Sequence, residues 1–414
     1  MTSRPALACL LAAVLSTCVT QAETLNFAPG PDLQEKVQEA FITAQPGTTF
    51  HFAAGRYEFE MGLSLDLDNC TIKGDGMDKT IWTFKTQDAG SEGLLVTSDG
   101  VTLEDLAIED TRGNAFKSNA ANNLTIRRIR TEWTAGPKTE NGAYGLYPVN
   151  GENILVEDCV VKGASDAGVY VGQSRHVIVR RNYVQYNVAG IEIENCYFAD
   201  VYENTATQNT GGILVFDMPG LPQKGGHDHR VYKNNVYDNN TPNFAPPGNT
   251  VAGVPAGTGI MVMANHNIEI FDNTLRDHGT THFMLTSWLA TEKPYQDPDY
   301  QTNPEGIHIH HNTVGDGGNK PGGRGGSNIA KMAGTPIPDL VWDGIVDATK
   351  LVDGKLPADK RIYAHDNKKE SGEFTAVNLG GLDALLKLDA SRITLGTDQF
   401  SGSLPRLKPV TLGK

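Results

Sequence analysis

The chain has 414 residues, a net charge of −14 at pH 7 and 45 glycines. An acidic surface repels nucleic acid and anionic lipid headgroups, so we exclude both as partners. A chain of this length can bury a large core, and its many glycines suit a fold that is rich in turns.

The first 22 residues have the anatomy of an export signal. Arg4 precedes the apolar run 6–14, and Thr20-Gln21-Ala22 forms a small-x-small cleavage site. The run is too short to span a membrane, and no later stretch is long enough. We therefore expect cleavage near Ala22 and an exported protein, periplasmic or extracellular; a lipoprotein attached at Cys18 is the alternative.

Residues 23–50 are predicted to form an N-terminal cap. Leu33, Val37, Ala40 and Phe41 fall on one face of a helix that ends before Pro46. An amphipathic helix in this place would cover the open end of the repeat array that follows.

Short repeated strands fill residues 51–316. A unit of about 22 residues is written twice between 166 and 216 and then begun a third time, and each copy holds two alternating runs such as GVYVG and VIVRRN. A period near 22 without a helical segment is typical of a solenoid. We predict an all-β, parallel β-helix of about nine to eleven coils in one domain.

The second strand of each coil indicates structural ladders. The column that ends this strand is asparagine from Asn182 to Asn367, which predicts an asparagine ladder. The preceding column alternates in sign from Asp105 to Lys233, which predicts charge pairs that hold the register. The neighbouring His308, His310 and His311 are interpreted as ordinary outward residues of these columns, not as a metal site.

The first strand of each coil has an unusual outward face. Its two outward columns are Tyr147, Tyr170, Glu192, Leu214, Met261, Met284 and Val149, Gly172, Glu194, Phe216, Met263, Thr286. Aromatic and apolar side chains here would meet water, so the face is either a binding site or a surface that a lid contacts.

Three insertions flank this face. Residues 217–229 and 287–305 follow the strand, whereas 239–258 precede it, so they leave from opposite edges. Insertions gathered around one face of a solenoid usually serve binding. The alternative is that they only cover Leu214, Phe216, Met261 and Met263.

Residues 317–414 are predicted to hold a flexible glycine-rich loop (GGNKPGGRGGS), a last coil around Ile362 and a C-terminal cap that includes 382–388. Three cysteines remain after the signal, Cys70, Cys159 and Cys196, and we expect all three to be free thiols.

Several blocks carry a family resemblance: YGLYPVNGENILVED (144–158), AGVYVGQS (167–174), AGIEIEN (189–195), TGGILVFD (210–217), TPNFAPPGN (241–249) and PAGTGIMVMA (255–264). The chain resembles right-handed parallel β-helix proteins of the pectin-lyase-like superfamily, and more specifically a family of exported, functionally uncharacterised β-helix repeat proteins. The resemblance implies a carbohydrate-facing sheet and, in many members, polysaccharide lyase, hydrolase or epimerase chemistry. The Asp-Pro-His-Asp block of alginate epimerases is missing, so the resemblance does not decide whether the chain is an enzyme.

Three functions stay open. In the first, Tyr147, Tyr170, Glu192, Glu194 and Phe216 bind a polysaccharide, because a sugar ring packs on an aromatic ring while its hydroxyls meet the acids. Glu192, Glu194 and Asp217 are then candidates for catalysis or for a bound Ca²⁺, which would make an anionic sugar acceptable. The alternative for the two glutamates is an ordinary solvent-facing position.

The second function is a non-catalytic assembly or interaction factor of the cell envelope that uses the same face for a protein partner. The third is a copper-handling maturation factor, in which Met261, Met263 and Met284, with Met218 and His227 nearby, bind a soft metal.

Overall fold

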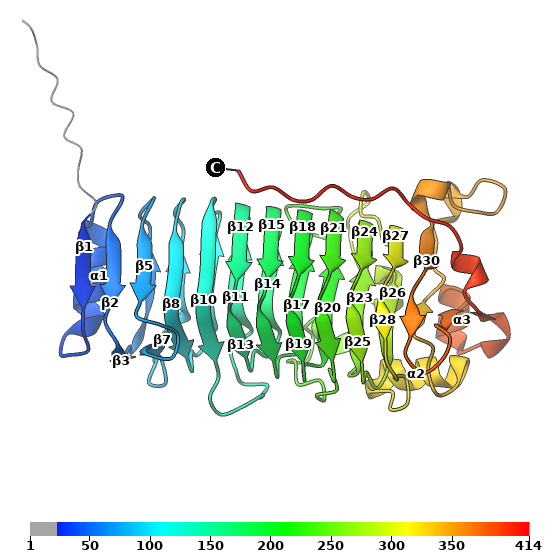
Figure 1. The fold of residues 1–414 in the computed structure, drawn as a ribbon, viewed down its shortest axis with the longest axis horizontal. Coiled ribbons are helices and arrows are strands. Elements are labelled where there is room, and N and C mark those ends of the chain that lie inside the picture. Colours follow the sequence, from blue (N-terminus) through cyan, green and yellow to red (C-terminus); the bar gives the residue numbers. More distant parts are fainter. Residues whose placement is uncertain (1–22, 414) are drawn as a thin grey trace, which may run out of the picture.

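The computed structural model describes residues 23–413 and shows one parallel β-helix (Figure 1). The predicted export signal and Cys18 lie outside these residues. No helix in the described part of the chain is long and apolar enough to cross a membrane.

Each regular coil holds three strands, not the two that the sequence predicts. In one coil they are β14 (Ala167–Gly172), β15 (Arg175–Arg180) and β16 (Tyr183–Gln185). The third strand is only three residues long, too short to give a visible alternation. The three strands per coil stack into three sheets, called here sheets 1, 2 and 3.

Sheet 1 carries the predicted outward face. Its strands, in stacking order, are β4 (Met61–Leu65), β7 (Ala89–Val96), β9 (Asn114–Asn119), β11 (Tyr144–Val149), β14, β17 (Ala189–Glu194), β20 (Gly211–Phe216), β23 (Thr258–Met263), β26 (Thr281–Thr286), β29 (Leu340–Trp342), β32 (Ala376–Asn378) and β33 (Thr394–Leu395). Only the pairing of β32 with β33 is antiparallel in this sheet. The eleven parallel strands agree with the predicted number of coils.

Sheets 2 and 3 share two long strands that turn the corner between them, β8 (Thr102–Glu109) and β10 (Leu124–Glu132). Sheet 2 also contains β1 (Thr24–Phe27), β2 (Thr49–Phe52), β5 (Thr71–Gly74), β12 (Glu152–Glu157), β15, β18 (Tyr197–Tyr202), β21 (His227–Tyr232), β24 (His266–Phe271), β27 (Glu305–His310) and β30 (Ile362–His365). Sheet 3 contains β3 (Gly55–Glu58), β6 (Thr80–Thr83), β13 (Val160–Lys162), β16, β19 (Thr205–Thr207), β22 (Asn235–Tyr237), β25 (Thr274–Arg276), β28 (Thr313–Val314) and β31 (Lys368–Lys369).

The inward side chains of all three sheets form one long apolar core. Cys70, Cys159 and Cys196 belong to it as free, buried thiols, as predicted. Burial raises the pKa of each thiol to about 12, so none is a reactive thiolate at neutral pH.

The asparagine ladder is confirmed at the turn between sheets 2 and 3. Each amide donates to the next: Asn182 to Asn204 at 3.0 Å, Asn204 to Asn234 at 3.0 Å, Asn234 to Asn273 at 2.9 Å and Asn273 to Asn312 at 2.9 Å. A second ladder, which the sequence analysis missed, joins Asn187, Asn209 and Asn239 at the next corner. Both ladders satisfy buried turn amides that water cannot reach.

The charge column forms separate pairs rather than a continuous ladder. Arg128 donates to Asp105 at 2.6 Å, and Arg181 donates to Asp158 at 2.8 Å. Residues of this column have a left-handed backbone, with φ of 52° at Arg128 and 55° at Arg181. The residues of this column therefore form the turn, and their side chains add ion pairs at its surface.

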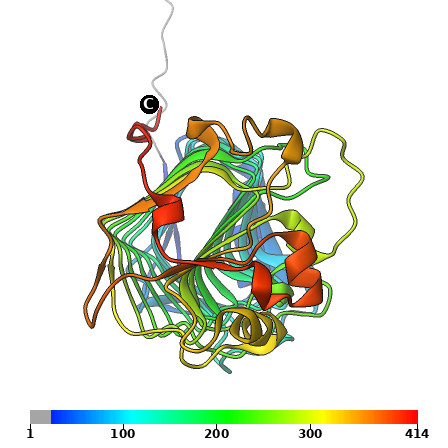
Figure 2. The ribbon, with the colours of Figure 1, turned by 90° about the vertical axis from the view of Figure 1, so that its right-hand side faces the viewer.

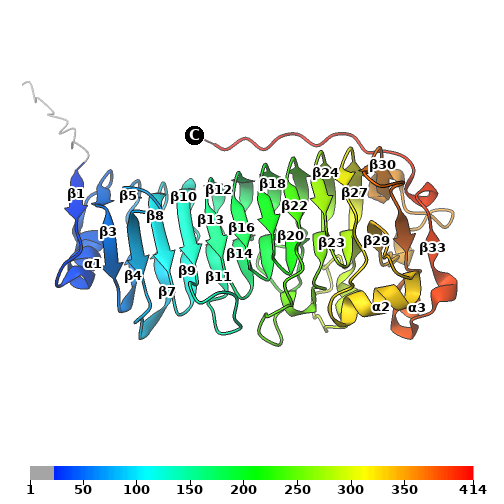
Figure 3. The ribbon, with the colours of Figure 1, turned by 60° about the horizontal axis from the view of Figure 1, so that its bottom comes forward.

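Helices and a strap cover the ends and one side of the stack. Helix α1 (Leu33–Thr43) caps the N-terminal end through Leu33, Val37 and Phe41, as predicted. The C-terminal region adds α2 (Gly323–Ala333), α3 (Leu382–Lys387) and the 3-10 helices at Ala348–Lys350, Ala358–Lys360, Ala390–Arg392 and Asp398–Phe400; two more lie in insertions, at Val251–Gly253 and Trp288–Thr291. Residues 401–413, the C-terminal strap, run back along the stack beside sheet 2 (Figures 1 and 3).

The predicted flexible loop at GGNKPGGRGGS is wrong, because half of it lies in α2. Local propensity disfavours a helix with three glycines. Ile329 and Met332 nevertheless bury one face of α2 against the outer side of sheet 1. A Cβ on Gly325 would lie 2.9 Å from Pro255, so the close approach of the helix requires glycine there.

Candidate functional site

The outward face of sheet 1 is covered, in agreement with the alternative that the insertions cover Leu214, Phe216, Met261 and Met263. The alternative of solvent-facing positions for the two glutamates is wrong. Tyr170 is 4% exposed, Glu192 2% and Glu194 6%, and Phe216 is fully buried. These side chains belong to a second apolar cluster outside the β-helix, together with Val251, Val254, Trp288 and Tyr300 from the insertions. Figure 2, a view down the stack, shows insertions and C-terminal helices gathered outside the coils.

The insertions meet above the face because they leave it from opposite edges. Lys293 Nζ donates to Gly248 O at 3.1 Å and to Thr250 Oγ1 at 3.3 Å, which joins the insertion 287–305 to the insertion 239–258. Tyr300 donates to Asp217 O at 2.5 Å, and Lys224 pairs with Asp297 at 2.7 Å. The three insertions therefore form a connected roof.

Four carboxyl groups lie beneath this roof: Asp166, Glu192, Glu194 and Asp217, each no more than 6% exposed. Asp166 Oδ2 accepts from Asn249 Nδ2 at 2.9 Å, and Asp217 Oδ1 accepts from Gly226 N at 2.8 Å. Glu192 Oε2 and Asp217 Oδ2 are buried without a hydrogen-bond partner in the described part of the chain. Unpaired buried oxygens of this kind favour the protonated acid.

Burial is the main cause of the perturbed acidity of all four groups. It raises the pKa of Asp166, Glu194 and Asp217 to about 7. It also raises the pKa of Glu192 well above its usual value, and the negative charges of Asp166 and Glu194 add to this effect. The cluster therefore holds protons near neutral pH, the condition for general acid or base chemistry.

Three tyrosines pack against the acids. The rings of Tyr144, Tyr147 and Tyr170 lie within 4.9 Å of one another between centroids. Tyr170 Oη donates to Glu194 Oε1 at 2.5 Å, and this hydrogen bond lowers the pKa of Glu194 against the larger effect of burial. The sequence correctly predicted that Tyr147, Tyr170, Glu192 and Glu194 share one face, but not that the face is closed.

An open groove begins one coil beyond Glu192 and Glu194. Glu194 is the in-register neighbour of Phe216, and Phe216 lines the groove together with Met261, Met263 and Met284 on its floor. The hollow has a volume of about 1130 Å³. Its walls come from the insertions 239–258 and 287–305, from α2 and from the region of α3, beside β23 and β29 in Figure 3.

The side chains around the groove differ in character. The α3 side is apolar, with Leu382, Leu385 and Leu386, whereas Lys293, Arg324 and Lys331 are basic. None of these three cations forms an ion pair with a described carboxylate within 4.0 Å. Glu292 and Asp343 also line the groove, so its basic side chains outnumber its acidic ones by three to two.

The predicted calcium set does not converge in the described residues. Two groups of His, Asp and Glu bring their ligand atoms within 4.8 Å of one another, and neither contains Glu192, Glu194 or Asp217. For the soft-metal set, Met261, Met263 and Met284 do share the groove floor. His227 lies on β21 of sheet 2, where its ring stacks on Tyr197 at 4.4 Å and binds Asp228 at 2.7 Å.

The sequence analysis missed Asp166, Tyr144 and Asn249. In the stacked register, Tyr144 aligns with Ala167, and Ala167 aligns with Ala189 and then Gly211, so one bulky ring stands beside small residues. This contrast in side-chain size could have identified Tyr144 as a tyrosine with free space beside its ring. No signal marked Asn249, which lies within the longest insertion and reaches Asp166 only through tertiary folding.

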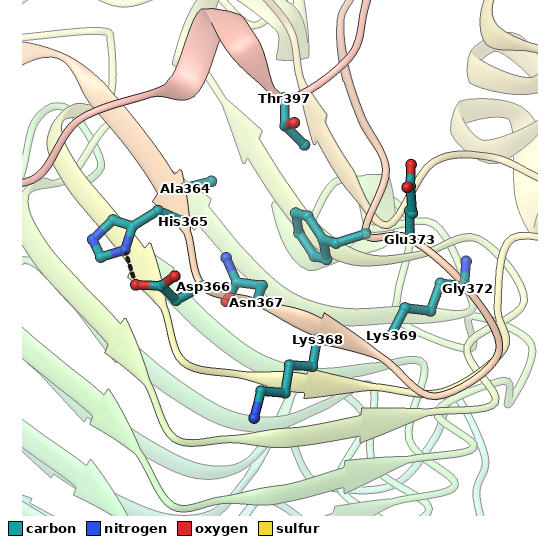
Figure 4. Close-up of a pocket in the computed structure, with 10 residues that line it drawn as sticks. Ala364, His365, Asp366, Asn367, Lys368, Lys369, Gly372, Glu373 and Thr397 are labelled. Atoms are coloured by element: carbon teal, nitrogen blue, oxygen red, sulfur yellow. Dashed lines mark hydrogen bonds and ion pairs between the residues drawn. The ribbon is translucent and has the colours of Figure 1, made fainter.

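A second hollow, of about 550 Å³, lies at the C-terminal end of the stack. Its lining includes His365, Asp366, Asn367 and Lys368 from the last coil (Figure 4). It is where the asparagine ladder stops, and it contains none of the predicted site residues.

Residues 64–221 match the family described as a right handed beta helix region. The structure resembles the A-module of the mannuronan C-5 epimerase AlgE4 from Azotobacter vinelandii, with a TM-score of 0.53 and 15% identity over 82% of this chain and 91% of that chain. The protein is a right-handed parallel β-helix. The predicted fold is thereby confirmed, and the narrower resemblance to an exported β-helix repeat family stays a prediction.

Endopolygalacturonase I from Stereum purpureum is a more distant neighbour, with a TM-score of 0.42 and 12% identity over 72% of this chain and 90% of that chain. No curated protein sequence matches the chain. At these identities the likeness establishes the β-helix fold, and the function has to be argued from the site.

Proposed function

We propose that the protein binds a glycan in the groove over sheet 1. The observation that carries the proposal is the groove itself, about 1130 Å³ in volume, walled by two insertions and floored by a regular sheet. Pockets that hold small ligands have volumes of roughly 300–1,000 Å³, so this groove has room for several sugar rings. A rigid sheet beneath variable loops is a common arrangement for binding.

The β-helix fold supports a polysaccharide ligand. The neighbour from Azotobacter vinelandii is named as a mannuronan C-5 epimerase, and its fold extends over most of both chains. Lys293, Arg324 and Lys331 around the groove suit a sugar that carries carboxylate groups. An anionic glycan would then be accepted without a bridging Ca²⁺, despite the net charge of −14.

The acid cluster would make the site capable of processing as well as binding. Glu194 and Asp166, with pKa values of about 7, can give or take a proton at neutral pH, and Tyr170 holds Glu194 in place. Tyr147 and Tyr170 would then stack on a sugar at the closed end of the groove. Because the roof covers these acids, a substrate reaches them only if the insertions 239–258 and 287–305 move apart.

A glycan array tests the proposal. Neutral, amino and uronic acid oligosaccharides are screened with the wild-type protein, with Gly253→Trp and with Gly30→Trp. Gly253 lines the groove and has no atom within 4 Å of an added Cβ, so tryptophan there fills the groove without an immediate clash. Gly30 has equal space but lies near the N-terminal cap, which makes it the matched control.

We expect wild type and Gly30→Trp to bind the same glycans and Gly253→Trp to lose them. Binding that survives in Gly253→Trp would place the site elsewhere. A protein partner of the envelope is the second candidate, because Leu386 on the wall of the groove is 57% exposed and an apolar wall suits a partner helix. An empty array, with a partner captured by wild type and not by Gly253→Trp, would favour that candidate.

Export and soft-metal binding are also kept as proposals. Mass spectrometry of the secreted protein should show Glu23 as the first residue, whereas a lipid on Cys18 would contradict cleavage at Ala22. A Cu(I) titration of wild type and Met261→Leu tests the methionine floor: a role in copper handling requires that the leucine variant lose a bound ion.

A further inference from the structure

A group of histidines on sheet 2 lies beneath the C-terminal strap. His308 and His310 are two residues apart on β27, so both point away from the core to which Ile307 and Ile309 belong. Glu269 on β24 is the in-register neighbour of His308. His308 and His310 occupy outward positions, as predicted, but they are covered rather than exposed, because His308 is 4% exposed and His310 2%.

The ligand atoms of Glu269, His308 and His310 all lie within 4.8 Å of one another, and all three residues are buried. His310 Nε2 lies 3.1 Å from Glu269 Oε1. His308 Nε2 faces His365 Nε2 at 2.8 Å, and His308 Nδ1 is buried without a partner in the described chain. A buried imidazole with an unused nitrogen and a second imidazole at contact distance is a costly arrangement unless something binds there.

Arg406 of the strap takes part in the same group. Its Nη1 lies 3.1 Å from Glu269 Oε1 and 3.2 Å from His310 Nε2, and its guanidinium lies over the ring of Phe271 at 4.5 Å. The backbone N–H of Leu407 donates to Glu269 Oε2 at 3.0 Å. Glu269 therefore anchors the strap through both of its oxygens.

We propose that Glu269, His308 and His310 form a binding site for a divalent transition metal of the Zn²⁺ class, and that the metal competes with Arg406 for this site. Two imidazoles and one carboxylate are a known ligand set for zinc that leaves a fourth position open. Ligands at about 2.0–2.1 Å from a tetrahedral zinc lie roughly 3.3 Å apart, close to the 3.1 Å between Glu269 and His310.

Metal binding and strap binding exclude each other at Glu269. A guanidinium stays protonated and has no lone pair to give, so Arg406 cannot be a ligand. A bound cation would repel the guanidinium of Arg406. It would also take Glu269 Oε1 as a ligand, so this oxygen could no longer pair with Arg406. The strap has few other anchors: Val410 N reaches Asp200 at 3.3 Å, and Gly413 N reaches Asn153 at 2.9 Å. Metal therefore loosens the strap around residues 406–407.

An exposed second group lies beside the first. His311, His365 and Asp366 also bring their ligand atoms within 4.8 Å. His365 Nδ1 binds Asp366 at 2.9 Å, which Figure 4 shows at the end of the stack. Its exposure makes it the weaker candidate, and the experiment has to separate the two groups.

Calorimetric titration of untagged protein with Zn²⁺, and visible absorption with Co²⁺ as a spectroscopic probe, tests the site. We expect one ion per chain in the wild type and a loss of affinity of at least about tenfold in His308→Asn and in His310→Asn. Arg406→Ala should bind Zn²⁺ about three- to tenfold more tightly, because it removes a competing positive charge. His176→Asn, which changes an exposed histidine, is the matched control and should bind as wild type does.

Hydrogen exchange gives a readout that does not depend on affinity. Zn²⁺ should speed exchange of the Leu407 amide in the wild type, because that amide is bound to Glu269. The proposal is overturned if wild type binds no Zn²⁺, if His311→Asn abolishes binding while His308→Asn does not, or if Arg406→Ala binds more weakly. Circular dichroism confirms that each variant is folded before it is compared.

Discussion

Glu192 is the residue on which the acid cluster depends most. It lies between Asp166 and Glu194, one of its oxygens is buried without a partner, and burial raises its pKa well above the usual value. Because the folded chain binds these protons more tightly than the unfolded chain, the free energy of unfolding depends on pH. The acids with a pKa of about 7 in the folded chain have values near 4 when it unfolds.

Whether the free energy of unfolding rises or falls with pH depends on whether unfolding takes up or releases protons. Because the folded chain holds these protons more tightly than the unfolded chain, unfolding releases protons between about pH 4.5 and pH 7. We therefore expect these acids to lower the free energy of unfolding as the pH rises through this window. Buried His229, His266 and His308 act in the opposite direction, because burial lowers their pKa values to about 3, about 4 and about 4, so the effect of the acids is measured as a difference between wild type and Glu192→Gln. Glu192→Gln should remove part of that slope and stabilise the protein at pH 8 by on the order of 1 kcal/mol.

Urea denaturation at pH 5, 6, 7 and 8 measures both effects. Asp347→Asn is the control, because Asp347 lies outside the acid cluster and hydrogen bonds from Thr349 lower its pKa rather than raise it. Equal pH slopes in wild type and Glu192→Gln would contradict a raised pKa of Glu192 in the folded chain.

At the scale of elements, the asparagine ladder is the device that repeats most regularly. The side chain of Asn234 makes four hydrogen bonds of 2.9–3.0 Å, two with Asn204, one with Asn273 and one with Val201 O. Asn234→Ala would leave several buried groups unpaired, so we expect a loss of about 3 kcal/mol in the free energy of unfolding. Asn235→Ala, next in the chain but only half-buried, should cost clearly less. Equal losses in the two variants would contradict a structural role for the ladder.

The charge pairs contribute less, because they lie at the surface. Arg181 contacts Asp158 and Glu157 at 2.7 Å. Arg181→Asp places like charges in contact, and we expect a loss on the order of 1 kcal/mol. Denaturation repeated in 1 M salt should shrink this loss, since salt screens exposed charges. A loss that is independent of salt would point to the lost packing and hydrogen bonds of the Arg181 side chain as its cause.

The strands could be predicted where alternation was long enough to detect. The pairs of runs in 166–216 became β14 and β15, and then β17 and β18, in the predicted register. The strands of sheet 3, such as β16, are too short to show the alternation of apolar and polar residues that predicts a strand. Helix α2 was mistaken for a loop because its glycines act against a helix locally, and only its contact with sheet 1 stabilises it.

At the scale of the molecule, the insertions turn a solvent face into a second core. The sequence showed which face they flank and that they leave from opposite edges. It could not show that they meet, because this depends on contacts such as Lys293 with Gly248 and Asn249 with Asp166. The same holds for the strap, whose Arg406 reaches Glu269 across 137 positions of the chain.

The arrangement divides the outer face into a closed part over the acids and an open groove over the methionines. We predict that a glycan enters the open groove first. Calorimetric titration of the best glycan from the array into wild type, Gly253→Trp and Gly30→Trp tests this most directly. We expect saturable binding to wild type and Gly30→Trp, and an affinity at least about tenfold lower for Gly253→Trp. Equal affinity of all three proteins would contradict it.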